Sequence, residues 1–375
     1  MFIEPVSFSH LFGLVPTAGK STALTPAQIE RTAPAVIKPD PIHPSVPVPQ
    51  VGIEKLTGRW HHLSDPALLD TLVKIEAAIN LRDPESARSL LTPLAGSSDA
   101  NVLFYFGIVE RERAKTMVFW QKAADLGHPS AMNNLAAFLP KGDPNVLRLL
   151  EKAAALGEYS AALGLGNLYR TGNGVAVDVV KGARYTQMAA ELGNAEAMSN
   201  LGGMYMHGVG VAPDPDKARH WFQRSALAGH PGGQYNYALA LLKGIGDKPD
   251  FAGFLQWAQV SADKDFLPAM YRIGVFYARP DDGRPPDFAL ASTYLKKCAV
   301  KNSGRCLAAL GVLTERGQGV TKDGTQALVL YALAVHHGHQ DARQNLMALQ
   351  AKLPDAERNA ASVKVRGILG ANSPL

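Results

Sequence analysis

A small residue recurs along this chain about every 36 residues. Seven positions carry this anchor residue, at spacings of 30, 36, 36, 36, 37 and 36 residues: Ala131, Ala161, Ala197, Gly233, Ala269, Cys306 and Ala342. An apolar residue stands four positions after each anchor: Leu135, Leu165, Leu201, Tyr237, Ile273, Leu310 and Leu346. The position after that is small in six of the seven repeats. Because residues at this spacing share one helix face, the pattern predicts a series of helices that approach each other closely at the small residues.

A glycine turn followed by aspartate comes after this helix in four repeats: Gly172 to Asp178, Gly208 to Asp214, Gly244 to Asp250 and Gly317 to Asp323. Glycine adopts the left-handed conformation that ends a helix, and aspartate caps the next helix. The second helix carries a large residue in each repeat: Phe119, Leu149, Tyr185, Trp221, Trp257, Tyr294 and Leu330. A single hairpin of this size cannot bury its apolar stripe, whereas stacked hairpins can. The sequence therefore predicts an all-α solenoid.

Composition agrees with closely packed helices. Apolar residues make up 46% of the chain and aromatic residues only 7%, which suits helices better than sheets. The net charge of +5 comes without the dense Lys/Arg clusters of a nucleic-acid-binding protein. No apolar run approaches the roughly 18 residues of a membrane span. We therefore expect neither a nucleic-acid partner nor a membrane span.

One repeat carries a recognisable consensus. It consists of Glu196 to Tyr205, Gly208-Val-Gly-Val211, Lys217 to Phe222, and Ala226 followed by Gly229-His230. This stretch resembles the Sel-one-like repeat family, which is related to the tetratricopeptide repeats. The similarity covers roughly residues 101–352 and is weakest in 101–159, where the units shrink to about 30 residues by losing the turn. The resemblance implies a right-handed α–α superhelix that serves mainly as an adaptor.

The chain divides into four predicted parts. Residues 1–52 are rich in proline, which lacks the donor that regular structure needs, so we expect a disordered spacer, with a docking motif as the alternative. Residues 53–100 are expected to form an N-terminal helical cap and 101–352 the repeat solenoid. Residues 353–375 are expected to form a C-terminal capping helix and tail.

The two cysteines stand eight residues apart in one connector. Cys298 lies near the predicted end of a second helix and Cys306 is the next anchor, so a short turn can bring their Cβ atoms within disulfide range. Two buried thiols are the alternative. The spacing also resembles the cysteine-rich branch of the family. A disulfide favours an oxidising compartment, and we expect a periplasmic or secreted protein. The cytoplasm is the alternative, because the N-terminus makes a poor signal peptide.

Cationic residues recur ten positions after the anchors, at the predicted ends of the first helices: Lys141, His207, Lys243, Arg279 and Arg316. One repeat has Thr171 there instead, preceded by Arg170. Stacking would align these side chains along one rim of the groove. They form either a track for an acidic partner or a set of cations that interact favourably with the helix dipoles.

The groove is expected to be lined by polar and aromatic residues of the first helices: Asn133, Asn167, Ser199, Tyr235, Tyr271 and Ala308. Tyr235 and Tyr271 are candidate partner-binding residues, because tyrosine offers a large contact area with a polar tip. Packing within the array is the alternative role. His336 and His337 are adjacent and point apart on a helix, which is poor geometry for chelation, so we predict no metal site.

No catalytic motif stands out, and the sequence predicts no cofactor. We expect a non-enzymatic scaffold that holds a protein partner with an acidic surface in its concave groove. From the resemblance alone, an immunity protein for a secreted toxin is the most concrete form of this function. The alternatives are a cell-wall-active hydrolase or penicillin-binding relative, suggested by cysteine-rich relatives, and a secreted effector that engages a host protein.

Overall fold

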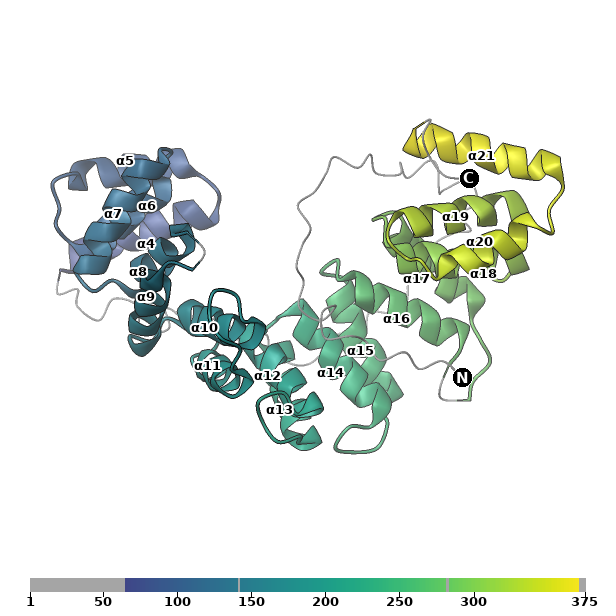
Figure 1. Ribbon diagram of the computed structural model, residues 1–375, viewed down its shortest axis with the longest axis horizontal. Helices are drawn as coiled ribbons and strands as arrows, with labels where there is room; N and C mark the ends of the chain where they lie inside the picture. The colour runs from purple at the N-terminus through teal and green to yellow at the C-terminus, as the bar shows by residue number, and fades with distance from the viewer. Residues whose placement is uncertain (1–64, 141, 281–282, 371–375) are drawn as a thin grey trace. The chain divides into compact units, whose positions relative to one another are not determined.

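The computed structural model describes residues 65–140, 142–280 and 283–370. All regular structure in this part of the chain is helical, as the repeat predicts (Figure 1). The expectations for residues 1–52 and for Lys141 fall outside the described residues. The described chain forms two compact units, which meet in sequence between Lys264 and Asp265.

The unit that ends at Lys264 contains twelve α-helices among its described residues. The first three are α4 (Pro66–Asn80), α5 (Pro84–Leu91) and α6 (Ala100–Val109), with a short 3-10 helix at Thr92–Leu94. Six helices follow: α7 (Arg113–Asp125), α8 (Pro129–Phe138), α9 (Pro144–Ala155), α10 (Tyr159–Thr171), α11 (Val179–Glu191) and α12 (Ala195–His207). The last three are α13 (Pro215–Leu227), α14 (Pro231–Lys243) and α15 (Phe251–Ala262).

The unit that begins at Asp265 contains α16 (Leu267–Ala278), α17 (Phe288–Ala299), α18 (Gly304–Arg316) and α19 (Gly324–His336). They are followed by α20 (Ala342–Gln350) and α21 (Asp355–Leu369), and both of these pack against α19. None of the helices in the described residues is long and apolar enough to cross a membrane.

The anchor residues occupy equivalent environments. Ala197, Gly233 and Ala269 are all buried in the first halves of first helices, and Ala131, Ala161, Cys306 and Ala342 are buried too. The apolar residue four positions later is buried in all seven repeats. The anchor pattern therefore identified the buried stripe of each first helix.

The small residue five positions after the anchor lets the second helix come close. A Cβ built on Gly202 would lie 2.6 Å from the Phe222 ring, and one built on Gly311 would lie 2.7 Å from the Tyr331 ring. The second-helix residue that fills this space is one position later than the large residue singled out from the sequence. Phe222 is 6% exposed and Tyr331 is fully buried, whereas Trp221 is only half-buried. The seventh repeat departs from the rule, because Met347 is 63% exposed.

The glycine turns behave as the sequence predicts. Gly172, Gly208, Gly244 and Gly317 each adopt the left-handed conformation at the end of a first helix. The aspartates that follow are N-caps, whose side chains accept backbone amide hydrogen bonds: Asp178, Asp214, Asp250 and Asp323. Each such cap contributes about 1 kcal/mol to stability.

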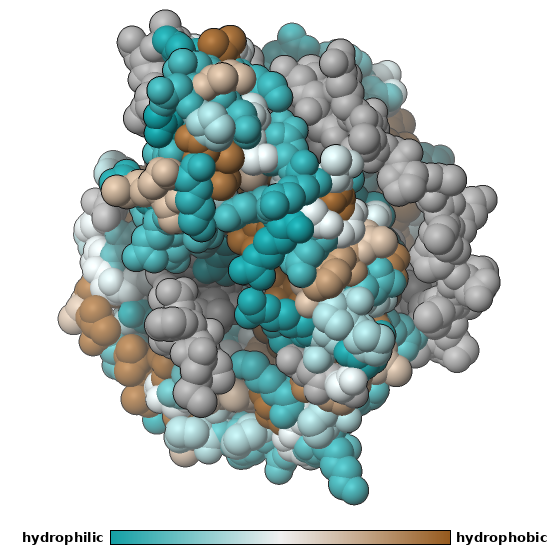
Figure 2. Space-filling view, turned by 90° about the vertical axis from the view of Figure 1, so that its right-hand side faces the viewer, coloured by the Kyte–Doolittle hydropathy of each residue, from teal (hydrophilic) through white to brown (hydrophobic). Residues whose placement is uncertain are grey.

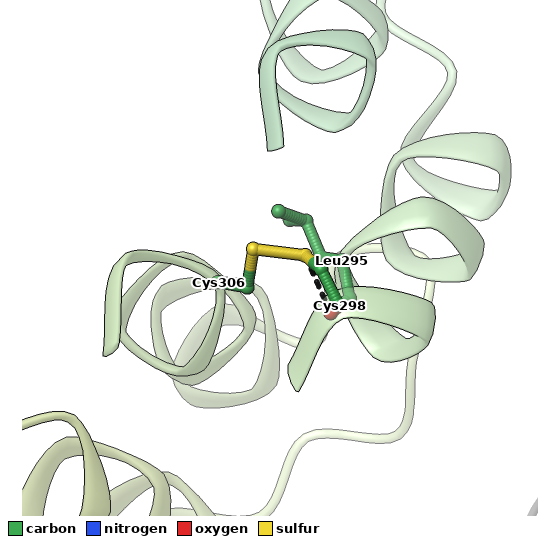
Figure 3. The surroundings of a disulfide bond; sticks show 3 residues. All are labelled: Leu295, Cys298 and Cys306. Carbon is green, nitrogen blue, oxygen red and sulfur yellow. Dashed lines mark hydrogen bonds between the residues drawn. A yellow bond between two sulfur atoms is a disulfide. The ribbon is translucent and has the colours of Figure 1, made fainter. Parts of the chain in front are cut away.

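Cys298 and Cys306 form a disulfide between the end of α17 and the first turn of α18 (Figure 3). Their Cα atoms are 5.9 Å apart and both side chains are fully buried. The same positions, eight residues apart, hold pairs of buried small residues in other repeats, such as Ala189 with Ala197. The disulfide therefore takes the place of a close contact between two small side chains.

Candidate binding surface

The predicted row of cations is only partly regular. His207, Lys243 and Arg316 are the last residues of their helices, as expected, and their side chains are exposed. Arg279 is exposed but lies one residue beyond α16, as its C-cap. Lys141 lies outside the described residues, and the helix that precedes it, α8, ends at Phe138. The register differs because Pro140 lacks the amide hydrogen that a continuing helix needs.

Arg170 differs from the other cations in its surroundings. Its side chain is half-buried, and Nη2 donates a hydrogen bond to Asn167 Oδ1 at 3.3 Å. Burial lowers the pKa of the guanidinium. A partner would therefore reach less of Arg170 than of His207 or Lys243.

The two candidate tyrosines, Tyr235 and Tyr271, are half-buried rather than fully exposed. Two other members of the predicted groove lining, Ser199 and Ala308, are buried and do not face an open groove. Ser199 Oγ instead accepts a hydrogen bond from Asn236 Nδ2 at 3.0 Å, which joins α12 to α14. The prediction that these two residues line the groove is wrong because first helices contact the first helices of neighbouring repeats as well as their own second helices.

The predicted binding residues are divided between the two units. Arg170, His207, Lys243 and Tyr235 belong to the unit that ends at Lys264. Tyr271, Arg279 and Arg316 belong to the other unit. The candidate residues therefore fall into two sets, each considered within its own unit.

Two histidines that follow a glycine, His128 and His230, cap helices. Nδ1 of His128 accepts the amide hydrogen of Ala131 at 3.2 Å, and Nδ1 of His230 accepts that of Gly233 at 3.0 Å. Asn194 does the same for Ala197 with its Oδ1 atom at 2.7 Å. Burial lowers the pKa of His230, which favours the neutral ring that can accept this bond. Within the described residues, no group of three or more His, Cys, Asp or Glu side chains is placed to hold a metal ion.

An open pocket of about 540 Å³ lies where α6, α7 and α8 meet, and the sequence patterns did not predict it. Its floor is aromatic, with Trp120 from α7 and Phe138 from the end of α8. Arg111 and Arg113 lie at its edge and are exposed. The only signal in the sequence was the 30-residue spacing between Ala131 and Ala161, which shows that a turn is missing nearby.

A second pocket of about 520 Å³ follows α16 and is lined by the segment from Arg284 to Phe288, together with Tyr277 and Leu290. The Arg284 guanidinium lies 4.7 Å from the centre of the Phe276 ring and 5.6 Å from that of Tyr277. This arginine is thus already used in packing against its own unit.

The surface itself is mixed in character. On the face that Figure 2 shows, hydrophobic residues form separate small patches among hydrophilic ones. Several exposed apolar side chains stand at the start of α11, where Val177 is 63% exposed and Val180 49%.

Comparison with known proteins places the chain. Sel1 repeat models match seven segments, which together cover more than half of it: residues 96–128, 129–158, 160–194, 195–230, 231–265, 267–299 and 304–339. No curated protein matches the chain.

Several solved structures are similar to it. A Sel1 repeat protein of Oxalobacter formigenes is 24% identical, with a TM-score of 0.56 and coverage of 78% of this chain and 85% of that one. A protective antigen of uropathogenic Escherichia coli with an SLR fold is 18% identical, with a TM-score of 0.35 and coverage of 86% and 96%. An immunity protein of Pseudomonas aeruginosa is 21% identical, with a TM-score of 0.38 and coverage of 56% and 81%. With seven matched repeats in an all-helical structure, this chain belongs to the Sel1 repeat family.

Proposed function

We propose that the protein is a non-enzymatic scaffold that binds a protein partner with an acidic surface along the C-terminal ends of its first helices. The observation that carries the proposal is the exposure of His207 and Lys243 at the same place in successive repeats. Arg279 and Arg316 are the corresponding candidates in the other unit. Tyr235 and Tyr271 are proposed as half-buried contacts on the same helices, about two turns before Lys243 and Arg279.

The rival explanation is that these cations only stabilise their own helices. A cation at a helix C-terminus contributes roughly 0.3–1 kcal/mol to stability. The two roles make different predictions, because a dipole effect changes folding stability and leaves partner affinity unchanged. Steering by exposed charges instead changes the association rate and weakens with added salt.

The test begins with affinity purification of the partner from the native cell. Binding of that partner is then measured for the double variant His207→Glu/Lys243→Glu. Because exposed ion pairs are worth roughly 0.2–1 kcal/mol each, we expect affinity to fall by roughly 2- to 30-fold, mostly through the association rate. Lys152→Glu is the matched control, since Lys152 is also exposed in the last turn of a helix but belongs to a second helix. Equal effects of the two variants would contradict the proposal.

An immunity role is the more specific form of this function, and it is drawn from the family resemblance. It predicts that the partner is a toxin and that co-expression of this protein protects cells from it. If the toxin remained lethal while the complex formed at stoichiometric amounts, the scaffold function would stand and the immunity role would be rejected.

We further propose that the protein works in an oxidising compartment. The disulfide between Cys298 and Cys306 supports this, since structural disulfides persist mainly outside the reducing cytoplasm. Rapid alkylation of thiols in intact cells, followed by mass spectrometry, is expected to find both cysteines unmodified. Alkylation of both in most molecules would instead indicate a reducing compartment.

A further inference from the structure

In three of the four regular repeats, the glycine turn lies over the second helix of the preceding repeat, whereas the fourth, at Gly174, faces Gly142 in the connector between α8 and α9. A Cβ built on Gly210 would collide with the carbonyl of Val179, the first residue of α11. One built on Gly319 would collide with the carbonyl of Phe288, the first residue of α17. Arg219 of α13 donates a hydrogen bond to the carbonyl oxygen of Gly246 at 3.4 Å. These three turns therefore cover the first turn of the preceding second helix.

The repeat formed by α8 and α9 has no such turn. Only residues 139–143 connect its helices, compared with residues 208–214 between α12 and α13. The preceding second helix is α7, whose first residue, Arg113, is equivalent to Val179 and Phe288. The open pocket lies here, lined by Arg113, Thr116 and Trp120 of α7. The pocket is thus the place that a glycine turn fills in the regular repeats.

The lining of the pocket matches the chemistry of the missing turn. In the regular turns, Val209 and Val211 are half-buried and pack against the hydrophobic core. In the pocket, Trp120 and Phe138 form an aromatic surface against which an apolar residue of this kind could pack. The Trp120 ring lies against the place of a Cβ on Gly107, and its Nε1 donates a hydrogen bond to Phe104 O at 3.2 Å, which holds the floor rigid.

The charges at the edge favour an acidic neighbour. Arg113 lies over the Phe138 ring at 5.0 Å and donates a hydrogen bond to Phe138 O at 3.2 Å, so its guanidinium is held at the rim. The one acidic lining residue, Glu110, accepts the amide hydrogens of Arg111 and Glu112 at 2.8 and 3.0 Å. These bonds lower the pKa of Glu110 and direct its carboxylate towards its own backbone. Arg111 already forms an ion pair with Glu85, with 2.7 Å between Nη2 and Oε1, so Arg113 is the arginine at the rim that favours an acidic neighbour.

We propose that this pocket binds a glycine-containing turn of a partner protein, in which an apolar residue is followed by an acidic one. The partner's turn would take the place of the turn that the α8–α9 repeat lacks. This inference rests on the proposed protein-binding function and adds a second, specific contact site to it. The regular turns of the chain supply the order of residues, since each ends in an aspartate, such as Asp214; within the chain this aspartate caps its own second helix.

The test uses a cyclic peptide that contains the chain's own residues 207–214, His-Gly-Val-Gly-Val-Ala-Pro-Asp, closed by a terminal disulfide that pre-organises the turn. The full chain, labelled with 5-fluorotryptophan, is titrated and followed by fluorine NMR. The Trp120 signal is assigned by its loss in Trp120→Phe. We expect a saturable shift of this signal, and no shift with a control peptide in which both glycines are replaced by valine.

Two variants locate the binding. Replacing residues 139–142 with residues 205–213 supplies the missing turn within the chain and is expected to weaken peptide binding at least tenfold. Arg113→Glu is expected to weaken it several-fold, and Lys152→Glu to leave it unchanged. An unchanged affinity in the turn-supplied variant, or no Trp120 shift at saturating peptide, would overturn the inference.

Other occupants would also be detected. A spin label at Ser45→Cys that broadens the Trp120 signal would show that the chain's own N-terminal segment fills the pocket, and a shift that depends on protein concentration without peptide would show a second copy there. Either result would overturn the assignment to a partner. If the peptide does not bind while His207→Glu/Lys243→Glu still weakens the native complex, this inference is rejected and the proposed function stands. If that double variant leaves partner affinity unchanged while the peptide binds, the proposed cation surface is rejected instead.

Discussion

Residues 96–158 and residues 160–230 each hold two Sel1 repeats. Both regions pack their helices in the same way, but the first region uses fewer residues to do so. Both bury small anchor residues, and both bury a large second-helix residue against a glycine: Trp120 against Gly107 and Phe222 against Gly202. The regular pair adds glycine turns, whereas the short pair joins its helices through residues 110–112 and 139–143. The helix pairs therefore fold without the turn, and what the turn adds is cover over the neighbouring repeat.

The largest expected effect comes from a glycine that provides this cover. Gly210→Ala would place a methyl group against the Val179 carbonyl, and the residue would keep a φ of 71°. Left-handed strain and overpacking together predict a loss on the order of 3 kcal/mol. Gly142→Ala in the short repeat has a φ of 84° but open space around the Cβ, so we expect a loss of only about 1 kcal/mol. Urea unfolding of both variants measures the difference. Equal losses of stability would mean that the glycine turn does not pack closely against the second helix of the preceding repeat.

Removal of the disulfide is the next largest effect. Cys298→Ala/Cys306→Ala opens a loop of nine residues, for which the chain-entropy relation predicts a loss of about 2–3 kcal/mol. Because alanine already fills both equivalent positions in other repeats, we expect the variant to keep its helical content. Circular dichroism and urea unfolding check the two expectations. A loss below about 1 kcal/mol would show that the bond adds little to a connector that is already close-packed.

Engineered disulfides test whether the connectors in residues 96–158 and in residues 160–230 are equivalent. Ala123 with Ala131 in the short pair, and Ala189 with Ala197 in the regular pair, are fully buried and eight residues apart, like the cysteines. Paired cysteine substitutions at either position should oxidise spontaneously and stabilise the protein by roughly 1–3 kcal/mol. Thiol titration and urea unfolding provide the readout. A bond that forms in only one region would show that the missing turn also changes the connector.

The anchor pattern, the left-handed glycines and the aspartate caps were predictable because each depends on contacts within one repeat or with its direct neighbour. Predictions that needed accurate exposure were less successful. Ser199 and Ala308 were expected in the groove lining, yet helix-to-helix contacts between repeats bury them. Lys141 was expected to end a helix that in fact stops at Phe138, before Pro140. The open pocket arises from an absent segment, and its lining was not visible in any pattern of residues that are present.

A smaller effect concerns the start of α7. Its N-cap, Glu112, accepts no amide hydrogen bond from the helix, whereas Asp214 accepts one from Lys217 at the start of α13. Glu112→Asp shortens the side chain to the length that reaches these amides, and we expect a gain of about 0.5–1 kcal/mol. Asp214→Ala should lose a similar amount. Thermal unfolding measures both, and a gain at Glu112 would show that the short repeat gave up its cap along with its turn.

The smallest expected effect is a difference in pH dependence between His230 and its counterpart Asn194. Both cap the amide of an anchor, but only the histidine can lose its acceptor by protonation. Burial lowers the pKa of His230 in the folded protein, with a smaller lowering from Lys264 and an opposing effect of Glu196. The unfolded chain therefore binds the proton more readily. The contribution of His230 is complete above the unfolded value of about 6.5 and is lost as the pH falls from there through the folded pKa.

His230→Asn keeps an acceptor at this cap, as Asn194 shows, and removes the titrating group. We expect the variant to match the parent at pH 7.5 within about 0.5 kcal/mol, since asparagine is a good N-cap. Between pH 6.5 and pH 5 the parent should lose stability more steeply than the variant, which urea unfolding at several pH values measures. His337, whose pKa burial also lowers, is present in both proteins and cancels from the comparison. Parallel pH profiles would contradict this expectation. They would mean that protonation of His230 does not destabilise the folded protein, so that the histidine and asparagine caps are equivalent at every pH.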